Sequence, residues 1–288
     1  MAADDATLLA AVERAFGEIA RIHGLMSHQD EQSELSRLNR AAPGEWLAIH
    51  PDTETVLRFS LELWALSKGR FDPAARTEPS LGEPVFEVEP GRARRLAPAS
   101  LDLGGVAKGY AVDRAVAALV GAGLPGARGS VNAGGDLRLF GEIERTVSLV
   151  SGAGPDAAGP RARELRLRGG QSVASSSSAG AQDGVASRFH DPLKGRPFVA
   201  RRSCSVVAPE CMAADALTKV VLLAGGILNG IATVPNEAET LIGRCLARFS
   251  AEALLTDDDT GATRVYLPDY SSIALASLDV PYGACDTE

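Results

Sequence analysis

The chain has 288 residues, of which 45% are hydrophobic and 23% are charged, and its formal net charge is −8. This composition is typical of a globular protein, and the length is sufficient to bury a large core in one domain or two lobes. The negative charge disfavours a nucleic-acid-binding surface and favours a site that holds phosphates through bound cations. No apolar run reaches the roughly 18 residues of a membrane span. The N-terminus lacks the basic and apolar regions of a signal peptide, so we expect the chain as given to be cytoplasmic.

The first quarter of the chain is predicted to contain two helices and one strand. Apolar residues recur at helical spacing over residues 5–26 and predict a helix whose apolar stripe includes Leu8 and Phe16. Residues 45–50 are predicted to form a strand. The helix that follows this strand opens on a proline and is predicted to end at Gly69.

Loops separate the remaining predicted elements. Residues 75–95 are expected to be loop-like, and residues 151–163 a surface loop of low hydrophobicity. Helices are predicted over residues 107–122, 213–224 and 236–249, and strands over residues 128–132, 136–140, 164–168, 171–176, 203–207, 251–256 and 263–266. The chain shows no internal repeat, and the tail from about residue 268 matches no pattern that we can assign.

The four cysteines are Cys204, Cys211, Cys245 and Cys285. Their spacing matches no zinc-binding pattern, and four thiols in a chain of this length do not form a disulfide framework. A cysteine-based metal site and a redox switch are the alternatives. We expect the thiols to be reduced.

A glycine-rich segment at residues 101–113 is the most informative part of the sequence. It reads Leu-Asp-Leu-Gly-Gly-Val-Ala-Lys-Gly-Tyr-Ala-Val-Asp, and a short apolar strand turns into a helix there. Glycines allow the backbone to approach a ligand closely, and a helix start offers N–H groups to an anion. Lys108 adds a positive charge and Asp102 a hydrogen-bond acceptor. The segment therefore indicates a site for a phosphate-bearing cofactor; the alternative is an ordinary glycine turn with Lys108 in solvent.

Five segments together resemble the FAD:protein FMN transferase (ApbE) family. They follow the family order and cover residues 26–39, 101–113, 131–137, 191–197 and 214–218. The first is similar to "MSxYxxxSELSRLN", the second to "DLGGIAKGYAVD" and the third to "VNAGGDL". The last two are similar to "DPxTGRP" and "ADALxT". The sequence is thus identified as a member of this family.

The resemblance implies a fold and an activity. The expected fold is α+β, with mixed, largely antiparallel sheets flanked by helices, in a single compact two-lobed domain over residues 1–288. The expected activity is Mg²⁺-dependent transfer of FMN from FAD to a Thr or Ser hydroxyl of an acceptor flavoprotein, with release of AMP. With water as the nucleophile, the same site would be an FAD pyrophosphatase. A flavin-binding protein with little transfer activity is the other alternative.

The resemblance also implies a magnesium site and a catalytic role for its carboxylate. The aspartate of the family pattern "ADALxT" corresponds to Asp215. In the family, this aspartate binds the metal together with a hydroxyl and with a backbone carbonyl that corresponds to that of Gly105. Mg²⁺ prefers a few hard oxygen ligands and can bridge a pyrophosphate. The family threonine stands four residues after the aspartate, where this chain has Lys219. Thr218 lies on the same helix face as Asp215 and could substitute, and Lys219 could supply charge directly to phosphate.

Two positions depart from the family pattern close to the expected nucleotide site, for which Asp102, Gly104 and Lys108 correspond to FAD contacts. Gln29 replaces a tyrosine that would stack on an aromatic ring, so we expect weaker flavin or adenine binding. His190 is displaced by two residues from the family histidine, whose place Arg188 takes.

In an extended segment, a displacement of two residues keeps a side chain on the same face, about 7 Å further along. His190 is therefore a candidate FAD contact and a candidate base for the acceptor hydroxyl, unless it is a loop histidine without a partner.

Further segments are weaker candidates. Residues 132–136 form either a tight turn or part of the ligand surroundings. Residues 175–178, a run of four serines, align loosely with the family "ATSG" element. Residues 260–263 resemble the start of a flavinylation target, "[ST]GA[ST]x[ST]", although Val265 stands at the last hydroxyl position. The family elements "MGT", on a strand before the first helix, and "LWGFG" are not found. Either that strand is lost or the start is truncated.

Overall fold

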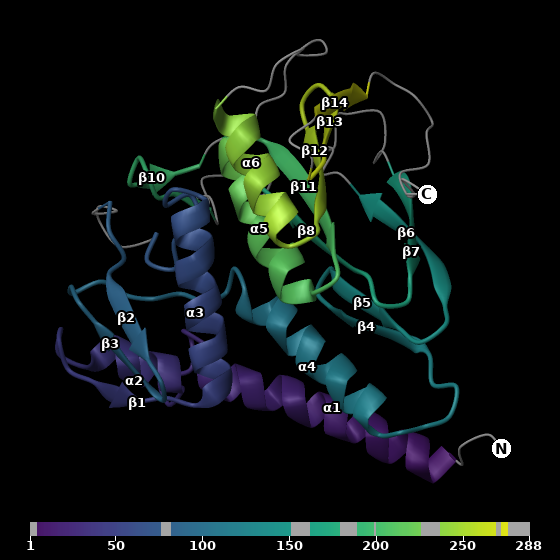
Figure 1. The fold of residues 1–288 in the computed structure, drawn as a ribbon, viewed down its shortest axis with the longest axis horizontal. Helices are drawn as coiled ribbons and strands as arrows, with labels where there is room; N and C mark the ends of the chain where they lie inside the picture. Colours follow the sequence, from purple (N-terminus) through teal and green to yellow (C-terminus); the bar gives the residue numbers. More distant parts are fainter. Residues whose placement is uncertain are drawn as a thin grey trace.

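The computed structural model describes residues 5–75, 82–150, 162–178, 189–198, 200–225, 237–268 and 272–275. Within this part of the chain, the main feature is a seven-stranded antiparallel sheet with helices on one face, and a three-stranded sheet lies apart from it (Figure 1). This architecture confirms the predicted α+β fold, with largely antiparallel sheets flanked by helices.

The large sheet has the strand order β14-β13-β12-β11-β8-β5-β4, and all neighbouring strands are antiparallel. The strands are β4 (Gly129–Ala133), β5 (Asp136–Phe140), β8 (Ser172–Ser177), β11 (Arg202–Ala208), β12 (Glu252–Asp257), β13 (Thr263–Tyr266) and β14 (Ser272–Leu275). Six of them correspond to predicted strands, whereas β14 lies in the tail for which the sequence indicates nothing.

Two helices that cover this sheet carry much of the functional site. Helix α5 (Cys211–Ala224) packs against β8 and β11, and helix α4 (Ala107–Gly121) packs against α5, β4 and β5. A Cβ atom on Gly109 would lie 2.3 Å from the carbonyl oxygen of Cys211. Only glycine therefore permits the observed approach of the two helices. Helix α6 (Glu237–Arg248) packs against α5; its predicted first residue, Asn236, lies outside the described residues.

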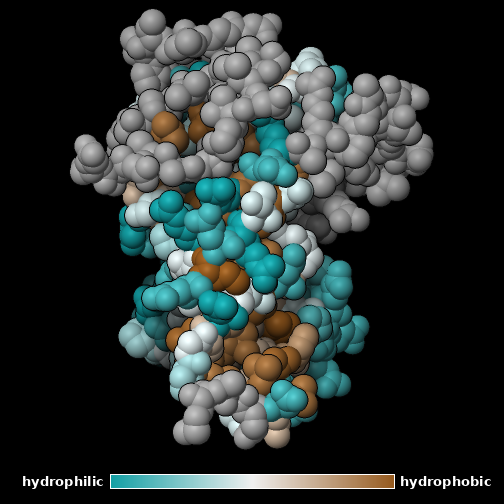
Figure 2. Space-filling view, turned by 90° about the vertical axis from the view of Figure 1, so that its right-hand side faces the viewer, coloured by the Kyte–Doolittle hydropathy of each residue, from teal (hydrophilic) through white to brown (hydrophobic). Residues whose placement is uncertain are grey.

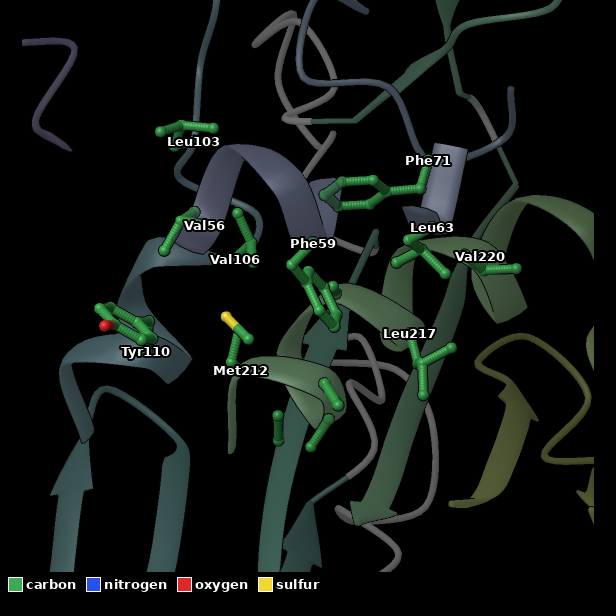
Figure 3. Close-up of a cluster of buried hydrophobic side chains, with 14 of the residues drawn as sticks. Val56, Phe59, Leu63, Phe71, Leu103, Val106, Tyr110, Met212, Leu217 and Val220 are labelled. Carbon is green, nitrogen blue, oxygen red and sulfur yellow. The ribbon is translucent and has the colours of Figure 1, made fainter. Parts of the chain in front are cut away.

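The main core fills the space between α3, α4 and α5 (Figure 3). Helix α3 (Pro51–Leu66) contributes Phe59 and Leu63, which are buried together with Val106 at the start of α4 and Leu217 of α5. The predicted helix to Gly69 stops at Leu66 because the chain enters the left-handed region at Lys68 and Gly69, with φ of 51° and 75°. This core fixes the three helices relative to one another.

Helix α1 (Asp5–Met26) packs along α4 through a face that differs from the predicted one. Ala11 and Ala15 are buried, whereas Leu8 and Phe16 are 50% and 67% exposed. Small side chains at the contact let two helices approach closely, which is why the alanines rather than the larger residues face α4. Hydrophobic areas lie between hydrophilic ones in the lower part of Figure 2, the side on which the N-terminal half of α1 lies.

The opposite face of the large sheet is covered by an antiparallel ribbon of β6 (Glu144–Val150) and β7 (Ala162–Arg168). Leu165 and Leu167 of this ribbon are buried against Leu139 and Val173 of the sheet in a second hydrophobic cluster. The predicted loop over residues 151–163 is therefore too long at its end, because Ala162 and Arg163 pair within the ribbon; its other residues lie outside the described chain.

A three-stranded sheet forms the second lobe, with strand order β1-β3-β2. Its strands are β1 (Leu47–Ala48), β2 (Phe86–Glu89) and β3 (Arg92–Arg95), and α2 (Glu34–Arg40) contacts β3. The sequence does not predict α2, whose N-cap Ser33 accepts a hydrogen bond from the N–H of Ser36. The loop expected over residues 75–95 is wrong for its second half, where β2 and β3 form a hairpin.

Arginine partners explain why this hairpin resembles a loop in sequence. The guanidinium groups of Arg92 and Arg94 each lie 4.5 Å from the centre of the Trp46 ring. Arg95 is buried and donates hydrogen bonds to the carbonyl oxygens of Leu38 (3.0 Å) and Ala99 (2.7 Å). The hairpin is thus stabilised by cation–π contacts and by hydrogen bonds to buried carbonyl groups, in addition to the buried side chains of Phe86 and Ala93.

Two further expectations concern membranes and thiols. Within the described ranges, none of the helices has the length and hydropathy needed to cross a membrane. Cys204, Cys211 and Cys245 are free and buried, as expected for reduced thiols, while Cys285 lies outside the described residues.

Candidate active site

One cavity of about 740 Å³ lies where α1, α4 and α5 meet the central strands of the large sheet, a size typical of cofactor sites. Six residues that the sequence predicts for the site line it, namely Gln29, Asp102, Gly104, Gly105, Lys108 and His190. They come from separate segments of the chain, so the fold brings the predicted nucleotide contacts together.

The cavity wall combines apolar and positively charged side chains. Helix α1 contributes Ile22 and Met26, and Phe71 follows α3. The positive groups are Arg70, which follows α3, Lys108 of α4 and Lys219 of α5. Such a wall can hold a ligand that has both a flat apolar part and an anionic part.

The glycine turn is held in place by segments that are distant in sequence. The Asn39 side chain donates to the carbonyl oxygen of Leu101 and accepts from its N–H, both at 2.8 Å. The N–H of Asp102 donates to the carbonyl oxygen of Pro73 (2.8 Å), and Oδ1 of Asp102 accepts from the N–H of Gly104 (2.8 Å). The predicted FAD contact Asp102 therefore also shapes the turn that it belongs to.

The start of α4 faces two buried carboxylates. The N–H of Gly109 donates to Oδ2 of Asp215 (3.3 Å), and the ammonium of Lys108 lies 3.1 Å from Oδ1 of Asp136. Both aspartates have a side chain that is about 0–1% exposed. Among the described residues, the Asp136 carboxylate forms this ion pair but no hydrogen bond.

The close approach of these charges shifts two pKa values. Burial raises the pKa of Asp136 to about 7, the negative charge of Asp215 adds to this effect, and the two nearby ammonium groups oppose it. Burial lowers the pKa of Lys108, but the charges of Asp215 and Asp136 outweigh burial and raise it above its ordinary value. Lys108 is therefore a cation at every working pH.

The side chain of Lys219 contacts one predicted metal ligand, Asp215, and lies next to another, Gly105. Its ammonium forms an ion pair with the Asp215 carboxylate and donates to the carbonyl oxygen of Asp215 (2.9 Å). A Cβ atom on Gly105 would lie 3.4 Å from Cε of Lys219. The hydroxyl of Thr218 donates to the carbonyl oxygen of Asp215 (2.6 Å) and is fully buried.

This arrangement of side chains does not fit a magnesium ion on Asp215. Mg²⁺ needs several oxygen ligands at about 2.1 Å in octahedral geometry, and the ammonium of Lys219 lies at the carboxylate oxygen that would bind it. The hydroxyl of Thr218 is engaged with a backbone carbonyl and with Ser176 (2.8 Å). In the part of the chain that the structure describes, no group of three His, Cys, Asp or Glu side chains is placed to hold a metal ion.

His190 and Gln29 both reach the cavity. His190 lies in the short strand β9 (His190–Asp191), which pairs with β10 (Arg196–Pro197), and its Nδ1 is buried without a hydrogen-bond partner among the described residues. Gln29 is exposed at the rim. Arg188 lies outside the described residues. The displaced histidine is thus placed where a ligand could meet it.

Asp113 places α5 beneath the cavity. Its carboxylate accepts hydrogen bonds from the N–H groups of Cys211 and Met212 (2.9 Å each) and pairs with Arg138 (2.6 Å). Asp113 belongs to the same predicted segment as Lys108 and caps the first turn of α5, so one helix positions both the lysine and Asp215.

Sequence reasoning assigned no site role to residues 70–72 and gave the serine run only as a weak candidate, yet both segments line the cavity. Arg70, Phe71 and Asp72 line it just after α3, and Ser175–Ser177 line it from β8. The Phe-Asp-Pro run at residues 71–73 and the serine run were the signals that could have identified them.

The remaining candidates behave as turns. Asn132 accepts a hydrogen bond from the N–H of Gly135 (3.1 Å), and Gly134 and Gly135 have φ of 60° and 100°, although Gly134 also lines the cavity. Residues 260–262 lie in the turn between β12 and β13, Thr263 begins β13, and Val265 is buried on that strand.

Comparison with known protein families and solved structures supports the family resemblance found in the sequence. The chain matches the ApbE family over residues 2–83 and 80–240. None of the curated protein sequences matches it.

Solved structures share the fold. The ApbE protein of Thermotoga maritima is 23% identical, with a TM-score of 0.71 over 88% of each chain. The flavin transferase ApbE of Vibrio cholerae is 22% identical, with a TM-score of 0.70 over 93% of this chain and 90% of that one. The flavinyl transferase ApbE of Pseudomonas stutzeri, in its apo form, is 16% identical, with a TM-score of 0.68 over 95% of this chain and 86% of that one. The chain belongs to the ApbE family.

Proposed function

We propose that this protein is a flavin transferase that moves FMN from FAD to a Thr or Ser hydroxyl of an acceptor flavoprotein and releases AMP. The observation that carries the proposal is the convergence of four of the five family segments on one cavity, with Lys108 beside the glycine turn. Structural relatives from Vibrio cholerae and Pseudomonas stutzeri are described as flavin and flavinyl transferases.

The cavity offers separate contacts for two parts of FAD, the pyrophosphate and the ring system. The start of α4 and the ammonium of Lys108 would hold the pyrophosphate, because backbone N–H groups and a fixed cation stabilise phosphate oxygens. The apolar wall of Ile22, Met26 and Phe71 would contact the ring system. Gln29 offers no aromatic face, so ring binding would depend on this wall.

In the transfer step, the acceptor oxygen attacks the phosphorus of the FMN moiety. The bond between this phosphorus and the oxygen that bridges to AMP breaks, and AMP leaves with that oxygen. The hydroxyl proton would pass to His190, which lines the cavity. Positive charge at Lys108 would stabilise the developing charge on the phosphate. The Mg²⁺ ion that the sequence predicts stays a prediction; because the side chains around Asp215 do not fit it, no step here depends on it.

A direct assay tests this proposal. The protein is incubated with FAD in the presence and absence of a synthetic peptide that carries the "[ST]GA[ST]x[ST]" pattern, and AMP and peptide mass are measured. Peptide-dependent AMP and a peptide that gains FMN are expected. FMN and AMP without peptide labelling would indicate a pyrophosphatase, and FAD binding without AMP would indicate a flavin-binding protein.

A histidine variant tests the proposed base. His190→Asn should reduce transfer by about 10²–10⁴, the usual contribution of a positioned general base. FAD affinity should change little, because Lys108 and the glycine turn remain. Rates are compared from about pH 6 to 9, which spans the titration of histidine. If the variant has the rates and pH dependence of the wild type, His190 is not the general base.

A further inference from the structure

The side chain of Lys219 occupies the space between two of the residues expected to hold a divalent cation, Asp215 and Gly105. It follows Asp215 by one helical turn, and its stem runs past Gly105 at the glycine turn. Its ammonium contacts the Asp215 carboxylate, the Asp215 carbonyl oxygen (2.9 Å) and Oγ of Ser176 (3.3 Å). An ammonium group has three donors, so each donor has an acceptor within the protein.

The neighbouring hydroxyls complete this arrangement. Oγ of Ser176 lies 2.8 Å from Oγ1 of Thr218, which donates to the carbonyl oxygen of Asp215 (2.6 Å). The hydrogen bonds therefore run from Lys219 through Ser176 and Thr218 to the carbonyl oxygen of Asp215, which Lys219 also contacts. Only 16% of the Lys219 side chain and 1% of the Asp215 side chain are exposed, so water screens this pair little.

A divalent ion on Asp215 would meet strong repulsion from this ammonium. Both cations would need the same carboxylate oxygen, in a cluster where the two carboxylates, Asp136 and Asp215, are already balanced by the charges of Lys108 and Lys219. Like charges that are close together and poorly screened repel strongly. Either the lysine or the ion can therefore occupy the position, but not both.

We propose that Lys219 is a built-in cation that takes the place of a divalent metal ion on Asp215, so that this site binds the pyrophosphate of its nucleotide without magnesium. Because its three donors are used within the protein, Lys219 acts through its charge, and Lys108 offers the direct contact. The nature of the ligand rests on the proposed function, whereas the exclusion of the metal rests only on the side chains described here.

Metal binding can be measured without any transfer reaction. Mn²⁺, which replaces Mg²⁺ at many oxygen sites and is visible by electron paramagnetic resonance, is titrated into the full chain in chelator-treated buffer. The wild type should bind no Mn²⁺ at submillimolar concentrations. Lys219→Thr removes the ammonium and adds a hydroxyl beside Asp215, and it should bind Mn²⁺ at least about tenfold more tightly. Lys68→Asn, at an exposed lysine paired with Glu237, is the control and should behave as the wild type, because asparagine tolerates the left-handed backbone at this position.

Binding of FAD, followed by flavin fluorescence with and without Mg²⁺, provides the second measurement. The wild type should bind FAD equally in both conditions. Lys219→Met, which keeps the apolar stem, should weaken FAD binding at least about tenfold. Binding of FAD by Lys219→Thr should become dependent on Mg²⁺; if this variant does not fold, Lys219→Met takes its place in the Mn²⁺ titration.

The outcomes separate this proposal from the proposed function. Stoichiometric Mn²⁺ binding by the wild type that is lost in Asp215→Asn would overturn the role of Lys219, as would FAD binding by the wild type that requires Mg²⁺. Failure of the folded Lys219 variant to gain Mn²⁺ would also overturn it. If the wild type binds no FAD, the proposed function fails, and the Mn²⁺ titration still decides whether Lys219 excludes the metal.

Discussion

Two groups of buried carboxylates and neighbouring cations lie on different sides of α4, and they differ in how completely the carboxylates are hydrogen-bonded. On one side, Asp52 of α3 accepts hydrogen bonds from the hydroxyl of Tyr110 and from Arg21 of α1, and Arg114 lies 3.8 Å away. Burial raises the pKa of Asp52, but Tyr110 and Arg21 outweigh burial and lower it. This group, the α3 anchor, joins three helices.

On the other side, Asp136 and Asp215 meet Lys108 and Lys219 below the cavity. Here the pKa of Asp136 is raised, because burial and the charge of Asp215 exceed the effect of the lysines. Lys108 and Tyr110 are two residues apart, which turns their side chains about 200° from each other on the helix. The same helix thus carries an anchor in which both Asp52 oxygens accept hydrogen bonds and a cluster in which the Asp136 oxygens accept none among the described residues. Charges that are satisfied stabilise the fold, and charges that are incompletely paired are available to a ligand.

The largest expected effect is on the cavity side. Asp215→Asn keeps the shape of the side chain but removes the charge that holds Lys219, so FMN transfer should fall by about a hundredfold, the usual loss when a charge-stabilising group is removed. The thermal midpoint should fall less than in a variant of the α3 anchor. AMP release and circular dichroism melting measure both quantities. Full AMP release by this variant would contradict a functional role for the cluster.

The converse effect is expected at the α3 anchor. Asp52→Asn removes charged hydrogen bonds to Arg21, and each such bond contributes about 1.5–3 kcal/mol to stability. We expect the free energy of unfolding to drop by about 2 kcal/mol while AMP release per folded molecule stays within twofold. Urea unfolding and the AMP assay are compared on the same preparation. A large loss of activity with unchanged stability would show that Asp52 serves function and not the stability of the fold.

A smaller effect is expected for the direct phosphate contact. Lys108→Ala should weaken FAD binding by about tenfold, or about 1.4 kcal/mol. Riboflavin, which has no phosphate, should bind as it does to the wild type. Lys68→Ala serves as the exposed control. Equal losses for FAD and riboflavin would show that Lys108 does not contact phosphate.

The smallest expected effect is the dependence of stability on pH. The folded pKa of Asp136 lies above its ordinary value of 3.8, so the unfolded chain loses this proton first. Stability is therefore lost as the pH rises from about 4 to about 7. Asp136→Asn lacks this loss, although it also leaves Lys108 without its partner. Relative to the wild type, its thermal midpoint should rise by at least about 2–4 °C between pH 4 and 7, since about 1 kcal/mol produces that shift and each unit of pKa corresponds to about 1.4 kcal/mol. A constant difference across this range would exclude a raised pKa at Asp136.

Local sequence determined most of the helices and the glycine turn. The glycine turn and α4 follow from residues adjacent in the chain, because a strand, a glycine pair and an apolar periodicity leave few backbone alternatives. The predicted loop at residues 86–95 was wrong because its strands are stabilised by the Trp46 ring and by buried carbonyls, which lie far away in sequence. The buried face of α1 likewise depends on how closely α4 approaches.

The sequence by itself also identified the family segments and the residues Asp102, Lys108, His190 and Asp215. Only the tertiary structure decided which of them share a cavity and what occupies the position expected for a metal. Helical spacing allows both Thr218 and Lys219 to lie near Asp215. The choice between them depends on β8, where Ser176 engages both side chains, and on the glycine turn beside the lysine stem. Contacts between segments distant in the chain made that choice, and no local pattern could encode it.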